Sequence, residues 1–401
     1  MEQLTSEQRK TNFEEVVKGY NAAQAVKEAN RCLECGCGKY YECKLVKYAD
    51  EYCEDWRLPE NRKHQNDFKY NDDHPFVVRD PNKCINCNLC LNMCKDVMGA
   101  EALEEVEIDD KIMIRPILGS QLLGTNCVSC GNCVSVCPTG ALQAATTNGK
   151  MVPLKTKKVR TTCPYCGVGC QIDLCVCGDR IVDVHPAFGP SNSGILCVKG
   201  KFAYEFVNHP DRLKTPLIKK NGEFVEASWK EALDLIEKNM KAIREKHGPD
   251  ALAGLSSARV SNEENYLFMK FMRAGIGTNN VDHCARLCHA STVAGLASVL
   301  GSGAMTNSIP EVLDADAILV QGSNTTIAHP VLGTRIIQAV KRGARLIVID
   351  PRRIPLAELA EIHLQIKPGT NIAITNGMIH VIIEEGLADM DYINARTEGF
   401  E

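Results

Sequence analysis

Two groups of four cysteines share one spacing that suits iron–sulfur chemistry. Each group has the pattern Cys-x2-Cys-x2-Cys-x3-Cys, which runs through Cys84, Cys87, Cys90 and Cys94 and again through Cys127, Cys130, Cys133 and Cys137. Thiolates at this spacing bind three corners of one 4Fe–4S cubane, and the fourth thiolate binds the neighbouring cluster, as in two-cluster ferredoxins. We therefore expect Cys137 to complete the first cluster and Cys94 the second. A zinc ribbon would leave the third cysteine of each group unused.

Two further cysteine groups have other spacings. One consists of Cys163, Cys166, Cys170 and Cys197, and the other of Cys32, Cys35, Cys37 and Cys43. We expect one 4Fe–4S cluster in each group, so that the chain holds four clusters in all. The alternative for both groups is a structural zinc bound by four thiolates, and Cys53 could compete as a ligand in the earlier group.

The composition narrows the class of protein. The 401 residues include 21 cysteines, and 46 Lys and Arg stand against 50 Asp and Glu, which gives a net charge of −4. This balance offers no basic excess for nucleic acid or for an anionic membrane surface. No apolar run approaches the roughly 18 residues of a membrane span, and the first 30 residues are too polar for a signal peptide. We therefore expect a cytoplasmic protein, where reducing conditions favour metal ligation over disulfides.

The second half of the sequence predicts an α/β unit. Short apolar runs at 317–320 and 345–349 are typical of buried strands, and a helical pattern at 334–341 separates them. Strand, helix and strand in this order indicate a parallel pair. A third short run at 363–366 precedes a further helix over 371–385. Earlier in the chain, a capping box of Ser228 and Glu231 begins an amphipathic helix that ends at Gly248.

Parallel α/β sheets bind ligands at the carboxyl ends of their strands. The loops at these ends therefore supply the candidate cofactor contacts, which are Gly322, Asn324, Asp350, Arg352, Gly369 and Asn371. For any one loop the alternative is a plain turn, because Gly, Asn and Asp are common turn formers.

Three stretches resemble the molybdenum- or tungsten-dependent formate dehydrogenases. They are the Cys163 group with its sequence CPYCGVGC, the phrase LCVKG at 196–200, and the stretch GTNNVDHCARLCH at 277–289. The similarity runs from about residue 160 to residue 401, and the ferredoxin-like part extends it to electron-entry forms of that family. The segment that ends in the Cys32 group is similar to one attached to glutamate-synthase-like flavin oxidoreductases.

The resemblance implies roles for three residues. Cys288 occupies the position of the metal-ligating selenocysteine or cysteine, and a thiolate is a soft donor that suits Mo or W. His289 would accept a proton or face formate as an electrostatic partner. Lys199 matches a lysine between the proximal cluster and the pterin. Without the flanking motifs, Cys288 would be interpreted as a buried structural cysteine and Lys199 as an ordinary surface lysine.

The same resemblance implies the cofactors, the reaction and the partners. The cofactors are 4Fe–4S clusters and Mo or W with bis-molybdopterin guanine dinucleotide, and the reaction interconverts formate and CO2. Electrons would leave the metal–pterin centre through the Cys163 cluster, the two ferredoxin-like clusters and the Cys32 cluster. The expected acceptor is a ferredoxin, a flavin and NAD(P) subunit, or hydrogenase subunits.

The sequence departs from the family in one respect and leaves three alternatives open. The family's catalytic subunit continues with more pterin-binding sequence, an arginine and a β-barrel, so we expect a fragment or a separate chain that completes the pterin site. The alternatives are an electron-transfer subunit resembling the large iron–sulfur subunit of complex I, another molybdopterin oxidoreductase, and a zinc-rich scaffold. A subunit that only relays electrons has no use for Cys288, His289 and Lys199.

The expected fold is an α/β domain with a parallel sheet of the pterin-dinucleotide-binding type, preceded by small α+β ferredoxin-like iron–sulfur domains. Five segments follow from this, namely a helical cysteine segment (1–55), a linker (56–76), a two-cluster ferredoxin-like domain (77–157), a 4Fe–4S domain of the molybdopterin oxidoreductase type (158–215) and an incomplete pterin-binding domain (216–401). Between Cys84 and Cys137 there is too little periodic apolar sequence for a core, so bound metal would supply folding energy there.

Overall fold

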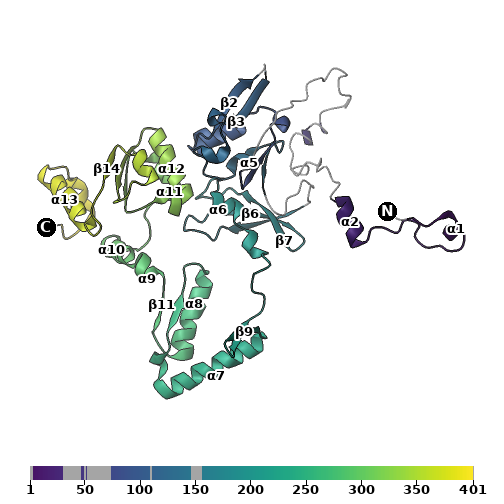
Figure 1. Ribbon diagram of the computed structural model, residues 1–401. Coiled ribbons are helices and arrows are strands. Elements are labelled where there is room, and N and C mark those ends of the chain that lie inside the picture. Colours follow the sequence, from purple (N-terminus) through teal and green to yellow (C-terminus); the bar gives the residue numbers. More distant parts are fainter. Residues whose placement is uncertain are drawn as a thin grey trace. The chain divides into compact units, whose positions relative to one another are not determined.

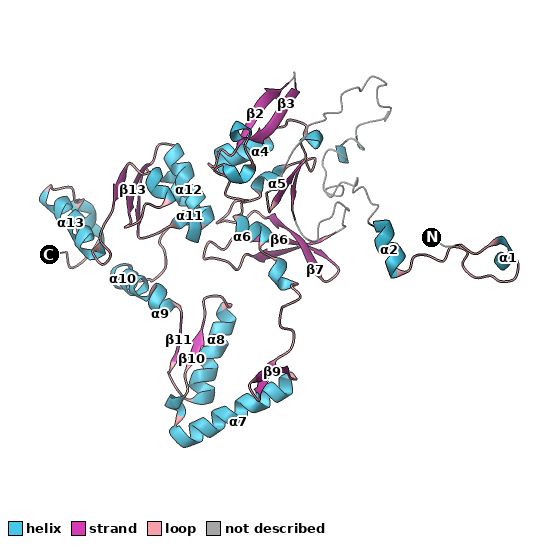
Figure 2. Cartoon of the chain, in the orientation of Figure 1, coloured by secondary structure: helices cyan, strands magenta, loops and turns pink. Residues whose placement is uncertain are grey.

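The computed structural model describes residues 3–29, 47, 48, 51, 74–108, 111–145 and 156–400. These residues form two compact units, which are treated separately below (Figures 1 and 2). The first unit contains residues up to 95 together with 100–159 and 173–185, and the second contains 96–99, 160–172 and 186–401. The Cys32 group, Cys53 and most of the predicted linker lie outside the described residues.

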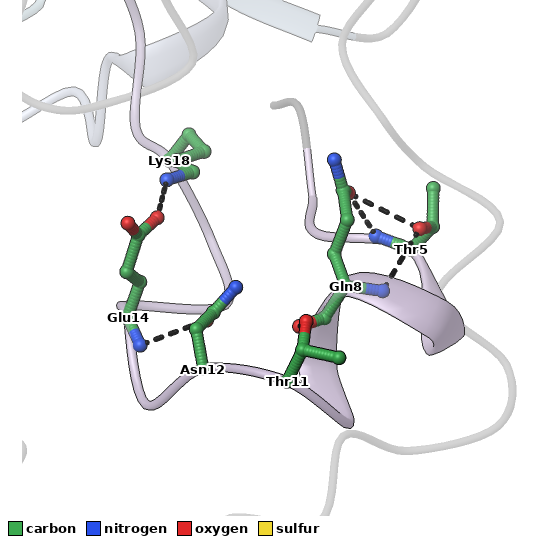
Figure 3. A network of polar contacts seen from close by, with 6 residues as sticks. All are labelled: Thr5, Gln8, Thr11, Asn12, Glu14 and Lys18. Atoms are coloured by element: carbon green, nitrogen blue, oxygen red, sulfur yellow. Dashed lines mark hydrogen bonds and ion pairs between the residues drawn. The ribbon is translucent and has the colours of Figure 1, made fainter.

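Two short helices, α1 (Ser6–Arg9) and α2 (Ala22–Ala29), begin the first unit. A capping box starts α1, because the Gln8 backbone N–H donates to Thr5 Oγ1 while the Gln8 side-chain Oε1 accepts from the Thr5 backbone N–H at 2.9 Å (Figure 3). In the loop that follows, Asn12 Oδ1 accepts from the Glu14 N–H, and the Glu14 carboxylate pairs with Lys18 at 2.6 Å. Local polar contacts therefore order this exposed stretch.

The cysteine-rich part of the first unit consists of short elements. They are β1 (Val77–Arg79), η2 (Pro81–Lys83), α4 (Leu89–Asn92), η3 (Met93–Val97), β2 (Leu103–Ile108), β3 (Lys111–Pro116), η4 (Ile117–Gly119), η5 (Leu122–Gly124), α5 (Asn132–Val136) and β4 (Leu142–Ala144). Strand β1 pairs antiparallel with β4, and β2 forms an antiparallel hairpin with β3. The apolar side chains buried among these elements include Val77, Leu103, Ile114, Leu122, Val134 and Leu142.

The next elements carry the third cysteine group and Lys199. They are β5 (Lys157–Thr162), β6 (Gln171–Cys177), β7 (Arg180–Pro186), α6 (Val198–Phe202) and η6 (Glu205–Val207), and the three strands form a sheet in the order β5-β6-β7. Cys197 is the N-cap of α6. The loop between β5 and β6 and the start of α6 therefore position all four cysteines of this group.

The helix predicted from the Ser228 capping box is confirmed as α7 (Trp229–His247). Ser228 Oγ accepts from the Glu231 N–H at 3.2 Å, and the Glu231 carboxylate accepts from the Ser228 N–H at 2.8 Å. Gly248 ends the helix with φ +83°, a backbone conformation that glycine adopts without strain.

The remaining elements belong to the α/β part of the second unit. They are β8 (Leu217–Lys220), β9 (Glu223–Glu226), η7 (Pro249–Ala251), β10 (Gly254–Ser256), α8 (Asn262–Lys270), η8 (Phe271–Ile276), β11 (Val281–His283), α9 (Ala285–Cys288), α10 (Ala290–Leu300), η9 (Ile309–Asp314), β12 (Ala317–Gln321), α11 (Thr325–Ala328), α12 (Pro330–Lys341), β13 (Arg345–Ile349), η10 (Pro355–Glu358), β14 (Ile362–Leu364), α13 (Asn371–Glu384) and α14 (Met390–Arg396). Strands β8 and β9 form an antiparallel hairpin, and β10 pairs in parallel with β11.

Strands β12, β13 and β14 form one sheet in that order, and both pairings are parallel. Ile318 lies opposite Leu346, and Val348 lies opposite His363. Val320, Ile336, Leu346, Val348 and Leu356 belong to the core cluster, so helix α12 and the loop after β13 cover the apolar strand side chains. No helix in the described part of the chain is both long enough and apolar enough to span a bilayer.

Candidate metal and cofactor centre

The first three cysteines of the Cys84 group and the last cysteine of the Cys127 group line one cavity. Cys84, Cys87, Cys90 and Cys137 all contribute to its wall, beside apolar side chains such as Ile85, Leu103 and Leu142. Burial first, and then Cys84 and Cys137, raises the pKa of the Cys90 thiol to about 12. A metal that binds this thiol would displace its proton, because a cysteine ligand is a thiolate. The structure therefore brings together the four residues that the spacing assigned to one cluster.

The other four cysteines of these two groups also influence one another. Burial, with smaller contributions from Cys127 and Cys94, raises the pKa of the Cys130 thiol to about 11. Burial likewise raises the pKa of Cys133 well above its usual value, and Cys130 and Cys127 add to the effect. Cys94 is thus close to the second group, although it belongs to the first group in sequence.

The backbone has the same conformation around the ligand cysteines of both groups. Asn86 and Asn88 have φ of +52° and +58°, and Ser129 and Gly131 repeat this with +54° and +70°. The left-handed residues turn amide groups inward, so that the Asn86 N–H lies 3.4 Å from Cys84 Sγ and the Ser129 N–H lies 3.4 Å from the equivalent sulfur of Cys127. Such hydrogen bonds stabilise negative charge on a ligand sulfur.

The third group is assembled within the second unit. The Cys163 N–H donates to the Cys170 carbonyl at 2.8 Å and closes the loop between β5 and β6. Burial first, and then Cys163 and Cys197, raises the pKa of the Cys170 thiol to about 12. Cys197 therefore lies near the other three cysteines, as the sequence predicts. Among the described residues, no three histidine, cysteine or acidic side chains are grouped closely enough to hold a single metal ion.

Asn192 positions the loop that leads to Cys197, and no motif in the sequence indicates this role. The side chain is fully buried. Its Oδ1 accepts from the Gln171 N–H at 3.0 Å, and its Nδ2 donates to the carbonyls of Ala187 and Ile195, each at 3.0 Å. In sequence, Asn192 stands between two serines and before a glycine, which indicates only a turn.

Replacing Asn192 by alanine is expected to destabilise the second unit by about 2 to 5 kcal/mol, because an amide and two carbonyls lose their partner inside the protein. The neighbouring exposed Ser193 provides the matched control, and S193A is expected to change the stability little. Thermal unfolding, monitored through the loss of visible cluster absorbance, would measure the stability of both variants. Equal melting temperatures for the two variants would contradict the role of Asn192.

Lys199 lies on α6, two residues after Cys197, and is exposed. Burial raises the pKa of the Cys163 thiol, and the positive charge of Lys199 is among the influences that lower it. The Tyr165 hydroxyl donates to the Ala203 carbonyl at the end of α6, and its ring packs edge-on against Phe206. These contacts hold the helix that carries Lys199 against the cysteine loop.

Cys288 and His289 stand at the junction of α9 and α10, and both are exposed. Because the Cys288 side chain is exposed in the described part of the chain, Cys288 is not a buried structural cysteine there. Arg286 pairs with Asp282 at 2.7 Å and braces the start of this short helix. Within the described residues, no hydrogen bond or ion pair joins Cys288 or His289 to the loops at the ends of the parallel strands.

The loops that follow β12, β13 and β14 contact one another. The Gly322 N–H donates to the Ile349 carbonyl at 2.9 Å, and Gln321 Nε2 donates to Asn371 Oδ1 at 3.4 Å. His363 Nε2 lies 3.1 Å from the Asp350 carbonyl oxygen. Gln321 and His363 link these loops, and no motif in the sequence indicates either residue.

The conformation of the same loops leaves polar groups accessible. Asp350 is buried, and its carboxylate accepts from the Arg352 N–H at 2.8 Å, while the Arg352 side chain is exposed. Gly322 and Gly369 have φ of +61° and +88°, which suits glycine. Asn324 is the N-cap of α11, and Asn371 is the first residue of α13. Backbone amides, amide side chains and a guanidinium are groups that bind phosphates and polar heterocycles.

Three protein-family models match successive parts of the chain. Residues 83–141 match the 4Fe-4S dicluster domain, which covers all eight cysteines of the first two groups. Residues 156–209 match the molybdopterin oxidoreductase Fe4S4 domain, and residues 212–400 match the molybdopterin oxidoreductase family. The chain carries molybdopterin oxidoreductase domains. The predicted resemblance to a molybdopterin enzyme with iron–sulfur domains is thereby confirmed.

Individual relatives of this chain include formate dehydrogenases. It is 50% identical to the alpha subunit of F420-dependent formate dehydrogenase 1 from Methanococcus maripaludis, over 61% of this chain and 36% of the relative. It is 46% identical to formate dehydrogenase H from Escherichia coli, over 61% of this chain and 35% of the relative. Acetylene hydratase from Pelobacter acetylenicus is a structural neighbour with 29% identity and a TM-score of 0.48, over 59% of this chain and 33% of that one. The chain thus spans about a third of the length of these relatives.

Proposed function

We propose that this chain belongs to a formate dehydrogenase that interconverts formate and CO2. The observation that carries the proposal is the identity of about half of the aligned residues to formate dehydrogenase alpha subunits, over about three fifths of the chain. When bound, Mo or W with bis-molybdopterin guanine dinucleotide would supply two-electron chemistry, which 4Fe–4S clusters pass on as single electrons. The alternative of a subunit that only relays electrons leaves the exposed Cys288 without a role.

In this proposal Cys288 binds the metal, since an exposed thiol at the end of a short helix is free to become a ligand. His289, its exposed neighbour, faces formate and accepts the proton that oxidation releases. Lys199 lies between the Cys163 cluster and the pterin, where an ammonium group donates hydrogen bonds to the heterocycle.

The strand-end loops hold the dinucleotide of the pterin cofactor. Six residues are assigned to this site, namely Gly322, Asn324, Asp350, Arg352, Gly369 and Asn371. The contacts among the three loops support the assignment, because they join the carboxyl ends of the parallel strands, where Arg352 Nε lies 3.6 Å from Asp350 Oδ1.

The sixteen cysteines of the four groups hold four clusters that lead electrons from the pterin to a partner. The cavity shared by Cys84, Cys87, Cys90 and Cys137 supports the crossed ligation of the first two clusters. The Cys32 group, with Cys32, Cys35, Cys37 and Cys43, takes the fourth cluster and delivers electrons to a ferredoxin, a flavin and NAD(P) subunit, or hydrogenase subunits. We also propose the five domain boundaries given above and a cytoplasmic location.

Metal and pterin analysis of the anaerobically isolated protein, with the subunits that copurify, tests this function. We expect iron, acid-labile sulfide, molybdopterin and either Mo or W, together with formate-dependent reduction of a viologen dye. Iron without Mo, W or pterin would contradict the proposed reaction and would favour an electron-transfer subunit. Zinc in a colourless protein would contradict the cluster assignment as well.

A further inference from the structure

A buried histidine lies beside one cysteine of the second group. His74 is 6% exposed and precedes β1. Its Nδ1 accepts two backbone hydrogen bonds, from the Phe76 N–H at 3.1 Å and from the Val77 N–H at 3.0 Å. A ring nitrogen that accepts carries no proton, and a neutral imidazole has one N–H, so the proton of His74 lies on Nε2. The surrounding backbone thus fixes the tautomer.

The Nε2–H of His74 points toward a ligand sulfur and the hydroxyl beside it. Nε2 lies 3.2 Å from Ser129 Oγ and 4.0 Å from Cys127 Sγ. Because Nε2 is the donor, Ser129 Oγ accepts its hydrogen bond, and the Ser129 hydroxyl still has a proton to donate. This hydroxyl is among the groups that lower the pKa of the Cys127 thiol. The Ser129 N–H lies 3.4 Å from the same sulfur. Three donors therefore converge on Cys127, either directly or through the serine.

The pseudo-equivalent sulfur of the first group has a different environment. Cys84 takes one backbone N–H, from Asn86 at 3.4 Å, and the Asn86 side chain presents to it an acceptor, Oδ1 at 3.4 Å, and no donor. Among the described residues that line its cavity there is an arginine, Arg79, but no histidine. The two halves share their backbone turns, so the histidine–serine pair is an addition to one half and is not a requirement of the turn.

We propose that His74 is a positioning residue that, together with Ser129, raises the reduction potential of the cluster bound by Cys94, Cys127, Cys130 and Cys133. This inference rests on the proposed iron–sulfur function and deepens it. Reduction adds one electron to a 4Fe–4S cluster of charge 2+ and leaves it at 1+, so its ligand sulfurs become more negative. Donors aimed at a sulfur stabilise that reduced form more than the oxidised form.

Two substitutions separate this role from a purely structural one. His74→Asn keeps an acceptor for the Phe76 and Val77 amides, because asparagine readily accepts backbone hydrogen bonds from the residues that follow it, but it removes the Nε2 donor. His74→Gln places an amide N–H at about the reach of Nε2. Ser129→Ala removes the hydroxyl and keeps the backbone donor. Asn86→Ala is the matched control in the first group.

Potentiometric titration of the anaerobically reconstituted full chain, followed by electron paramagnetic resonance, measures the effect. In H74N and in S129A we expect the midpoint potential of one cluster to fall, so that its ratio of reduced to oxidised form at the wild-type midpoint drops about three- to tenfold. A tenfold change in this ratio equals about 59 mV for a one-electron couple. H74Q is expected to restore most of the potential. The double variant H74N/S129A is expected to shift little further than either single variant, and N86A is expected to leave this signal in place.

Other outcomes overturn the inference. Wild-type potentials for both clusters in H74N would do so, as would an equal shift in H74N and H74Q. If H74N does not assemble its cluster, an unchanged potential in S129A overturns the inference on its own. Clusters that assemble with unchanged potentials leave the proposed function standing, whereas a wild-type chain without cluster signals refutes both.

Discussion

Replacing Cys288 by alanine is expected to abolish formate oxidation while every iron–sulfur signal remains. The exposed thiol at the end of α9 is the proposed protein ligand of Mo or W, and its loss removes a bond to the metal itself. Even partners of metal ligands cost about 10- to 100-fold in affinity or activity when they are removed, so the ligand should cost more than about 100-fold. Formate-dependent viologen reduction by the anaerobic enzyme measures this.

Cys284 provides the matched control for C288A, because it is an exposed cysteine at the other end of the same short helix. Its sulfur lies 3.4 Å from the Ala258 N–H, a contact that has no part in the proposed metal site. C284A is expected to keep most of the activity. Wild-type activity in C288A, or an equal loss in C284A and C288A, would contradict the assignment of Cys288.

Replacing Cys137 by serine is expected to remove the cluster of Cys84, Cys87 and Cys90. The cluster bound by the other three cysteines of the group that contains Cys137 should remain. The four cysteines share one cavity, and Leu142 supplies a further contact, with its N–H 3.4 Å from Cys137 Sγ. We expect the iron content to fall by about four atoms, the content of one cubane. Because metal binding adds to the free energy of folding, the midpoint for unfolding of this region should fall as well.

Cys94→Ser is the reciprocal test, since its thiol is near Cys130 and Cys133. It should remove the other cluster and leave the cluster signal that C137S loses. Iron analysis and electron paramagnetic resonance of the two variants identify which signal each one lacks. Loss of the same signal in C94S and C137S would contradict crossed ligation.

The cysteine groups could be predicted from the sequence because ligand spacing is a local property of the chain. A cubane imposes its own geometry, so three thiolates at fixed intervals indicate one cluster, and the fourth must come from the other group. The capping box at Ser228 is equally local, since it requires only a serine and a glutamate three residues apart. The short apolar runs that became β12 and β13 were identified for the same reason.

Residues that act across long separations could not be predicted. Asn192 satisfies the Gln171 amide 21 residues earlier, and His74 reaches Ser129 55 residues later. Gln321 meets Asn371 across 50 residues. Each of these side chains is of a type that most often occupies a turn or the surface, so its meaning depends on the fold that brings its partner close.

The most direct test of the account is to add formate to the anaerobically isolated enzyme, with its copurifying subunits, and to follow the clusters by electron paramagnetic resonance. We predict that formate alone reduces the iron–sulfur clusters of the wild type, and that C288A shows the same clusters only after dithionite. Clusters that dithionite reduces but formate does not, in an enzyme that contains Mo or W and pterin, would contradict the claim that these cysteines connect a formate-oxidising centre to its acceptor.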